Sequence, residues 1–403
     1  MSLVTIGMPV YKGGRHDGRF LKRALDSLLK QTFQDFKVII VDNDSPDDTA
    51  RLVRKQVKND PRFSYHRNPV NMGAAYSFTR LMMACESKYY HELHFDSYLA
   101  STFLEEGLKV LEADPAVVLA YSHCQFIDEA GNLLDIYRDT ADFAHDDPGQ
   151  RYLNILSGMG WCTAFHGLWR HEALALHYFE ALKRLNAAPD NEFLALAALR
   201  GKLVQIPKPL FFRLKDDYQR KSETSETLFD RRYAKSKEFP KAFFLPFCTW
   251  IHDHCQDLLL AADLPLDRKD ELIRQTVSIL LKRYKHMVDY ELGRAVDLVL
   301  KGEFKKGLLG PDEAPPPKGQ YKYLDFVYLA QLVRDLEYAH CLRPDFPKLA
   351  LARAVVRLEL GQRPEALAAL ETASRQAPGD QEVQELRARL QKVVGEPLNQ
   401  PGA

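Results

Sequence analysis

The chain has 403 residues, of which 46% are hydrophobic and 27% charged, the composition of a folded protein of roughly two or three domains. Its 55 lysines and arginines equal its 55 aspartates and glutamates, which excludes an overall positive field that would attract nucleic acid or an anionic membrane. The sequence shows neither a run of about 18 apolar residues nor a signal peptide, so we expect a cytoplasmic protein without a transmembrane segment.

The six cysteines are scattered without any CxxC pair, which is typical of reduced, mostly buried thiols. His252, His254 and Cys255 lie close together and raise the question of a zinc site. Such a site needs a second ligand pair at a defined distance, and the sequence shows none. We therefore expect an ordinary helix with polar side chains here.

The stretch from residue 4 to residue 49 predicts a strand, a helix and a second strand. Val4–Val10 and Lys37–Val41 are apolar runs of strand length, and Phe20–Gln31 carries leucine and alanine at helical spacing. This order is a βαβ unit, whose strands run parallel and bind ligands at their carboxyl ends. Asp42 follows the second strand directly, so we expect a binding residue that is exposed to a cleft and has little packing role.

Two loops of this half also have the composition of binding loops. Lys12–Arg19 is basic and rich in glycine, so it either contacts a diphosphate or is a flexible surface turn. Asn71 and Gly73 precede a helix whose first N–H groups can bind phosphate, although Gly73 can instead serve close helix packing. The elements expected around these loops are helices at Thr49–Lys58 and Ala74–Glu86 and strands at Phe63–His66 and Tyr89–Leu93.

Three motifs in this region resemble the opening of family-2 glycosyltransferases. They are Pro9-Val10-Tyr11, Leu28–Phe33, and Ile40–Ser45 followed by Asp48-Thr49. The resemblance implies an α/β, Rossmann-like GT-A domain that binds a nucleotide-sugar, followed here by an α-helical C-terminal region. It also implies that Asp42 hydrogen-bonds the nucleobase, most often uracil, with Asn43 beside it in the donor site. Pro9 and Tyr11 would shape the base pocket, and Asn71 and Gly73 would match the N-x-G element near the donor phosphates.

His94, Asp96 and Ser97 stand where the family carries an Asp-x-Asp motif. In the family these carboxylates hold Mg²⁺ or Mn²⁺ against the diphosphate leaving group. Here Asp96 is the one strong anionic ligand, and His94 offers a nitrogen ligand for Mn²⁺. The resemblance therefore implies a divalent cation at Asp96 and His94, while the reduced motif leaves metal dependence and turnover open. The alternative role for Asp96 is a plain strand-end cap.

The next part of the chain predicts a helix at Phe103–Ala113, a strand at Val117–Ser122 and a hairpin at Phe126–Leu134. Gly158–His171 resembles the segment behind the family's acceptor pocket. Its aromatic residues either stack on a sugar or base or belong to the core; they are Trp161, His166 and Trp169.

Asp190 and Glu192 lie in the first turn of a helix predicted within Pro189–Gly201. An acid there is favoured by the helix dipole in any protein. In the family, however, a carboxylate at this place removes the proton from the acceptor hydroxyl. The resemblance places this base on Asp190, with Glu192 as the reserve candidate.

The resemblance covers residues 4–215, and the chain after it is rich in helices. We expect helices at Phe243–Ala262, Arg268–Tyr290 and Leu292–Leu300, and a proline-rich linker at Lys305–Gly319. In the tail, prolines 34 residues apart frame a pattern of small residues that resembles a tetratricopeptide unit; it comprises Pro344, Ala354, Gly361, Ala366, Ala373 and Pro378. Such units bind proteins or dimerise, and the alternative is a helical cap on the enzyme.

We therefore expect a GT-A domain over residues 1–220, a helical domain over 221–310 and a tetratricopeptide-like tail over 320–396. The expected reaction is inverting, metal-assisted transfer from a nucleotide-sugar to a hydroxyl of a glycan, a lipid-linked or a protein acceptor. Two alternatives stay open: a GT-A domain that binds nucleotide-sugar or glycan without turnover, and a helical scaffold for protein interaction.

Overall fold

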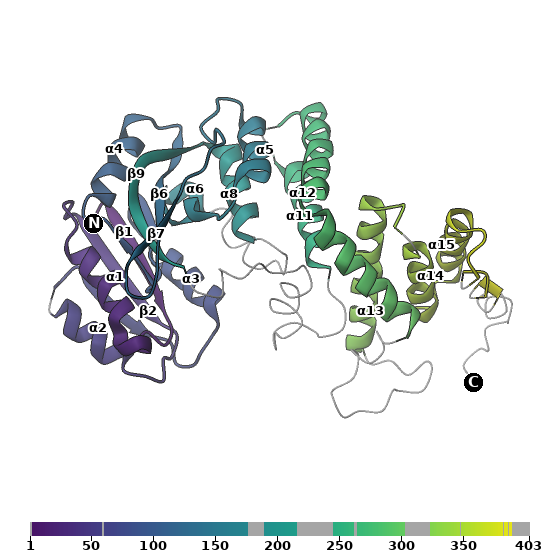
Figure 1. Ribbon diagram of the computed structural model, residues 1–403, viewed down its shortest axis with the longest axis horizontal. Helices are drawn as coiled ribbons and strands as arrows, with labels where there is room; N and C mark the ends of the chain where they lie inside the picture. The colour runs from purple at the N-terminus through teal and green to yellow at the C-terminus, as the bar shows by residue number, and fades with distance from the viewer. Residues whose placement is uncertain are drawn as a thin grey trace. The chain divides into compact units, whose positions relative to one another are not determined.

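The computed structural model describes residues 2–58, 60–175, 189–215, 245–261, 264–302, 323–346, 348–381, 383–385 and 387–388. The chain divides into two units, Met1–Ser222 and Glu223–Ala403 (Figure 1). The predicted linker Lys305–Gly319 lies outside the described residues, and the division of the second unit into two domains stays a prediction.

The first unit is built on a mixed sheet with strand order β3-β2-β1-β4-β8-β6-β9-β5, and β7 pairs with β6. Strands β1 to β4 run parallel, as the βαβ pattern predicts, whereas β8 is antiparallel to both of its neighbours. β6 and β9 are parallel, and β5 is antiparallel to β9. The strands are β1 (Val4–Val10), β2 (Phe36–Asp42), β3 (Phe63–Arg67), β4 (Tyr89–Glu92), β5 (Ser97–Leu99), β6 (Val117–Ile127), β7 (Leu133–Tyr137), β8 (Leu168–Arg170) and β9 (Lys202–Leu214).

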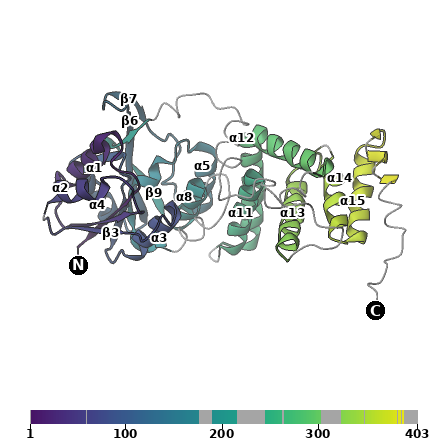
Figure 2. The same cartoon turned by 90° about the horizontal axis from the view of Figure 1, so that it is seen from below.

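Helices cover both faces of this sheet, with α1, α2 and α4 on one side and α3, α5 and α8 on the other (Figures 1 and 2). Because strand residues alternate between faces, Val38 and Ile40 join the core under α1 and α4, while Ile39 and Val41 pack on Leu81 of α3. The helices are α1 (Arg19–Leu29), α2 (Thr49–Val57), α3 (Ala74–Met83), α4 (Phe103–Ala113), α5 (Pro148–Gly158), α6 (His171–Ala175) and α8 (Pro189–Arg200), with 3₁₀ turns η1 (Arg15–Gly18) and η2 (Thr163–His166).

The largest differences from the predicted element boundaries in this unit concern one strand and one helix. β6 continues from Val117 to Ile127, beyond the predicted Ser122, because β9 pairs with it along this length and extends it into the hairpin with β7. The predicted helix Ala74–Glu86 ends at Met83.

The second unit is helical, with α11 (Pro246–Leu260), α12 (Leu266–Leu300), α13 (Tyr323–Leu342), α14 (Leu349–Glu359) and α15 (Arg363–Gln376). The sequence predicted two helices that meet near Glu291, whereas α12 continues through that residue and is kinked at Tyr284, whose backbone is not helical (φ −117°, ψ 20°). The buried carboxylate of Glu291 in α12 accepts hydrogen bonds from the backbone N–H of Phe247 (3.0 Å) and of Cys248 (2.7 Å). These bonds satisfy donors at the N-terminus of α11 that have no partner within their own helix.

The tail has the close helix pair that the small residues predicted. Ala350 and Ala354 of α14 pack with Ala369 and Ala373 of α15, and α14 is followed by Gly361 at φ 74°, a conformation that favours glycine. His252 and His254 lie inside α11, and the described part of the chain holds no group of three side chains suited to a metal. Among the helices whose residues are described, none combines the length and hydropathy that crossing a bilayer requires.

Candidate active site

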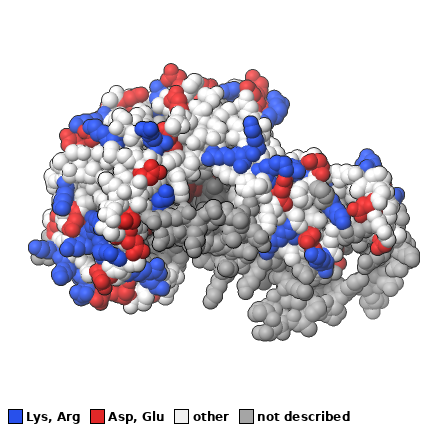
Figure 3. Space-filling view, viewed as in Figure 1, with Lys and Arg blue, Asp and Glu red and all other residues white. Residues whose placement is uncertain are grey.

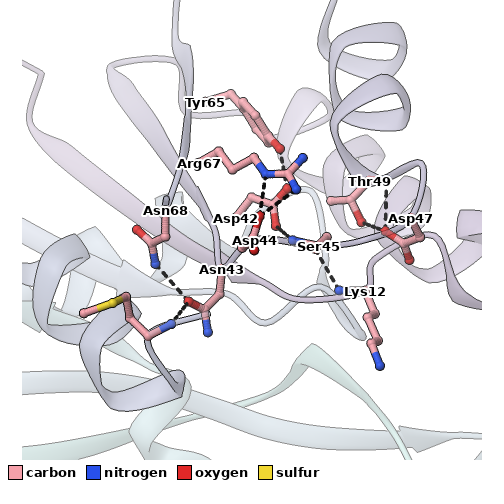
Figure 4. Close-up of polar contacts among 11 residues, drawn as sticks. Lys12, Asp42, Asn43, Asp44, Ser45, Asp47, Thr49, Tyr65, Arg67 and Asn68 are labelled. Carbon is pink, nitrogen blue, oxygen red and sulfur yellow. Dashed lines mark hydrogen bonds and ion pairs between the residues drawn. The ribbon is translucent and has the colours of Figure 1, made fainter. Parts of the chain in front are cut away.

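The loops after β1 and β2 meet at the carboxyl edge of the sheet, because the two strands are parallel and Val10 pairs with Asp42. The backbone N–H of Lys12 donates to Ser45 Oγ (2.9 Å) (Figure 4). The N–H of Gly14 donates to Asp47 Oδ2 (3.0 Å). The glycine-rich loop is therefore tied to the aspartate-rich loop by two hydrogen bonds, which differs from a flexible surface turn, one of the two alternatives for this loop.

Asp42 is fully buried, so the expectation that it is exposed to a cleft is wrong. Its Oδ1 accepts from the backbone N–H of Ser45 (2.9 Å), and its Oδ2 accepts from the hydroxyl of Tyr65 on β3 (Figure 4). Burial raises the pKa of Tyr65 well above its ordinary value, and the hydrogen bond and the charge of Asp42 raise it further. The carboxylate holds the loop that follows β2, a role that local sequence does not reveal because Tyr65 is 23 residues away.

Asn43 connects the two predicted parts of the donor site. Its buried amide oxygen accepts from Asn68 Nδ2 (3.0 Å) and from the backbone N–H of Met72 (2.9 Å) (Figure 4). Its nitrogen donates to Asn71 Oδ1 (2.7 Å), which also accepts from the N–H of Gly73 (3.0 Å). Asn43 thus positions the N-x-G segment beside the end of β2.

Gly73 is required by backbone conformation, and the alternative explanation of close helix packing is wrong. It precedes α3 at φ 83° and ψ 165°, which residues with a side chain rarely adopt. A Cβ added there would meet nothing within 4 Å. No described side chain caps the N-terminus of α3, so its first N–H groups face no competing acceptor of that kind.

The ends of β1 supply the remaining predicted donor residues. Pro9 pairs with Val41 in the register of β1 and β2. Tyr11 is the first residue beyond β1 and is 37% exposed, with the Lys12 ammonium 5.2 Å from its ring centre. Tyr11 is therefore an aromatic residue that reaches the surface at the end of β1, beside the end of β2 where Asn43 lies.

The residues at the Asp-x-Asp position include a carboxylate that sequence reasoning missed. Glu92 is buried at the end of β4, and its Oε1 lies 3.1 Å from Nε2 of His94. Desolvation alone would lower the pKa of His94, but the hydrogen bond and charge of Glu92 and the charge of Asp96 raise it above its ordinary value. The sequence does contain a signal for Glu92, because Glu92, His94 and Asp96 are spaced two residues apart.

Asp96 itself is partly exposed and accepts a hydrogen bond from the hydroxyl of Ser97 (3.3 Å). With Nε2 of His94 directed to Glu92, the second ring nitrogen of His94 and the carboxylate of Asp96 are the two ligands available here. Protein sites for Mg²⁺ commonly supply one or two ligands and leave the rest to substrate phosphates and water. The residues present therefore fit a cation site that a diphosphate completes.

The aromatic segment behind this site divides into core and surface. Trp169 is buried and donates its indole N–H to the carbonyl of Phe165 (2.9 Å), so it belongs to the core. His166 is also buried, with its ring centre 4.7 Å from that of His94, and burial together with the positive charges nearby lowers its pKa well below the ordinary value. Trp161 is 38% exposed, so it is the one of these three aromatic residues that reaches the surface.

Two cations at the end of β9 were not predicted from the sequence. Arg213 lies on β9 and pairs with Ser97 in the register of β5 and β9. Lys215 directly follows the last residue of β9 and lies 5.9 Å from the Trp161 ring centre. The signal that could have found them is their position, because both follow closely after the apolar pair Phe211 and Phe212.

The predicted base lies at the start of α8. Asp190 is exposed, whereas Glu192 is fully buried and Asn191 between them is also buried. α8 packs against η2, and η2 places His166 beside His94. The helix that carries Asp190 and the cation candidate His94 therefore both contact the short segment η2.

A mixed sheet of this order, with its polar cluster at the carboxyl edge, defines a Rossmann-like domain. Residues 5–166 match the family described as glycosyl transferase family 2, and residues 333–390 match a tetratricopeptide repeat. Both resemblances stated from the sequence are therefore confirmed over these residues, and so is the GT-A fold expected for the first unit.

The curated relatives cover one third of the chain. An uncharacterized glycosyltransferase of Methanocaldococcus jannaschii is 28% identical over 137 residues, which are 34% of this chain and 46% of the relative. The chondroitin synthase of Escherichia coli is 29% identical over 132 residues, 33% of this chain and 18% of the relative. The chain thus spans less than half the length of these two relatives.

Solved structures resemble the chain over a greater length. Residues 1–349 of S. aureus TarS align with a TM-score of 0.50 at 15% identity, covering 94% of this chain and 92% of that one. The same protein in complex with UDP-GlcNAc aligns with a TM-score of 0.51. This likeness establishes the fold.

Proposed function

We propose that this protein transfers a sugar from a nucleotide-sugar, UDP-linked in the first instance, to an acceptor hydroxyl. The observation that carries the proposal is the carboxyl edge of the sheet in a family-2 domain, where Asn43 and Asn71 join the loops around an exposed Tyr11. The complexes of S. aureus TarS with UDP and UDP-GlcNAc support the choice of nucleotide.

In the donor site, Tyr11 and Pro9 form the wall for the base, and Asn43 and Asn71 hold the segment that leads to α3. The N-terminus of α3 offers backbone N–H groups to the diphosphate, since Gly73 keeps its entrance free of a side chain. Asp42 acts through the loop that it holds, because both of its oxygens accept hydrogen bonds from the protein.

The transfer proceeds with inversion in one displacement. Asp190, the exposed acid of α8, accepts the proton of the acceptor hydroxyl, whose oxygen then attacks the anomeric carbon. The bond from that carbon to the diphosphate oxygen breaks, and the nucleoside diphosphate leaves with the electron pair. Asp96 and His94 are the residues that would hold Mn²⁺ or Mg²⁺, and the ion would supply positive charge to this leaving group. Glu192 remains the reserve base, although its full burial favours Asp190.

Two other functions have an observation in their favour. The pairing of His94 with buried Glu92 at the reduced Asp-x-Asp position favours a domain that binds nucleotide-sugar without turnover. The tetratricopeptide match at residues 333–390 favours protein interaction or dimerisation through the C-terminal helices. In either case we keep a cytoplasmic location and a glycan, lipid-linked or protein acceptor as predictions.

Calorimetric titration of UDP and of UDP-sugars, with and without Mn²⁺, tests the donor site, and sugar release or transfer tests the reaction. Asp190→Asn should keep donor affinity and lose transfer by about 10²–10⁴-fold, because the amide cannot accept a proton. Asp96→Asn should weaken Mn²⁺-dependent donor binding as well.

The matched control is Glu192→Gln, which lies in the same turn. If Glu192→Gln loses transfer while Asp190→Asn keeps it, the base is Glu192. If UDP binds and no UDP-, GDP- or dTDP-sugar is turned over, the protein is a binding domain, and if no nucleotide binds, the proposal is wrong.

A further inference from the structure

A groove of about 540 Å³ lies on the first unit between α1 and β5. Four cations line it, namely Arg19, Lys22, Arg23 and Lys30, with Asp26 as the one acidic residue among the lining side chains. Positions three, four and eleven residues apart lie on the same side of a helix, so these cations form one stripe along α1. The opposite side of α1 is apolar and packs in the core.

The floor of this groove is held in place by hydrogen bonds between α1 and β5. The backbone N–H of Leu99 donates to Ser27 Oγ (3.2 Å), and Gln31 Nε2 donates to the carbonyl of Ala100 (2.7 Å). One residue further on, the N–H of Thr32 donates to the carbonyl of Ser101 (2.8 Å). The groove is therefore a preformed feature of the folded domain.

Arg23 is fixed at the centre of the stripe. Its guanidinium lies 5.5 Å from the ring centre of Tyr98, and that ring stacks on Phe212 at 4.5 Å with 3° between the planes. Its Nη1 is buried and therefore closed to a ligand in the groove, whereas the residue as a whole is half-buried. The charge of a guanidinium held in this way attracts an anionic ligand.

The charge of the groove is only partly neutralised by the protein. Arg19 pairs with Glu129 (3.3 Å), and Asp26 accepts a hydrogen bond from Gln56. Within the described residues, Lys22 and Lys30 have no ion pair and both are exposed. Lysines and arginines gather over this part of the surface at the left of Figure 3, where Figure 1 places α1 and α2.

We propose that this groove binds a linear polyanion, a chain with repeated phosphate or carboxylate groups, and that this chain is the acceptor of the transfer. From Arg19 to Lys30 the stripe spans about 16 Å along α1, which is long enough for several anionic groups in a row. A hollow between a helix and a strand suits a chain better than a flat membrane. A membrane-binding helix also presents large apolar side chains to the lipid, and those of α1 are buried.

The position of β5 links the groove to the reaction, and this part of the inference rests on the proposed function. Tyr98 comes two residues after Asp96, a separation of about 7 Å along an extended chain. A polyanion held against Arg23 and Tyr98 therefore lies close to the proposed leaving group. The groove would hold the anionic groups of the acceptor, while a hydroxyl of the same acceptor chain reaches the donor.

The test measures binding of two soluble probes, inorganic polyphosphate and hyaluronan oligosaccharides, to the full-length protein. Calorimetry at several salt concentrations gives the affinity for each probe. Lys22→Glu combined with Lys30→Glu should lower the affinity for at least one probe by about tenfold, since each reversal removes one attraction and adds one repulsion. The matched control is Lys55→Glu with Lys58→Glu, which makes the same charge change on exposed residues of α2 and its end. UDP affinity, measured in parallel, should be equal in all three proteins.

The proposal is overturned if the wild-type protein binds neither probe, or if both double variants weaken binding equally, which would reflect net charge alone. It is also overturned if vesicles of phosphatidylglycerol bind while the soluble chains do not. Loss of UDP binding in every protein would contradict the proposed function and leave the groove result standing. Polyanion binding at the groove together with UDP binding supports both.

Discussion

The burial of Asp42 gives a prediction opposite to the one that its sequence position suggests. Asp42→Ala removes the acceptor for the Ser45 N–H and the Tyr65 hydroxyl, both tied to one fully buried carboxylate. Hydrogen bonds to a charged group contribute about 1.5–3 kcal/mol each, and because water can reach Tyr65 we expect a total loss of about 3 kcal/mol. For a domain of this size, that lowers the melting temperature by about 6–12 °C.

Tryptophan fluorescence in urea measures this loss for the first unit alone, because Trp161 and Trp169 lie there and a Trp250→Phe background silences the second unit. Tyr65→Phe should lower the free energy of unfolding by about 1–2 kcal/mol. In the Tyr65→Phe background, Asp42→Ala should lower it by less than in the wild type, because one of the two hydrogen bonds is already absent. If Asp42→Ala leaves the stability unchanged and abolishes UDP binding, Asp42 contacts the ligand and the structural role assigned here is wrong.

Three further predictions concern other parts of the chain. Gly73→Ala should destabilise the first unit by about 1–3 kcal/mol because its φ is 83°, although the space around it is open. Gly293→Ala inside α12 should instead stabilise the second unit by about 0.5–1 kcal/mol. Equal effects of the two changes in urea unfolding would contradict this reasoning. Burial raises the pKa of Glu291 from 4.5 to about 8, so the folded second unit keeps a proton that the unfolded chain releases. Its unfolding free energy should therefore fall between pH 4.5 and 8 by up to about 1.4 kcal/mol per pH unit, a decline that Glu291→Gln should flatten; an unchanged pH profile would remove Glu291 as its source. Deleting the chain from Tyr321 should leave UDP affinity unchanged, and a folded truncation that no longer binds UDP would show that the tail is needed for the donor site.

Much of the fold follows from local patterns. The apolar runs of β1 and β2 and the helical spacing of α1 predict a βαβ unit, because each pattern lies within a dozen residues and matches one periodicity. The same locality explains why the start of α8 was predicted correctly at Pro189. It also explains the error in α12, where a break was predicted near Glu291 and the helix is instead kinked at Tyr284.

The tertiary structure decided which polar groups meet. Tyr65 reaches Asp42 from a neighbouring strand, and Asn43 bonds Asn71 across 28 residues, because sheet register brings together loops that are distant in the chain. The groove between α1 and β5 has the same origin: the cations of α1 follow a helical spacing that the sequence displays, but only the packing of β5 turns that stripe into a hollow. Residue types and the periodicity of apolar residues are local properties that can be seen in the sequence. Burial and hydrogen-bond partners depend on contacts that form only when the sheet is assembled.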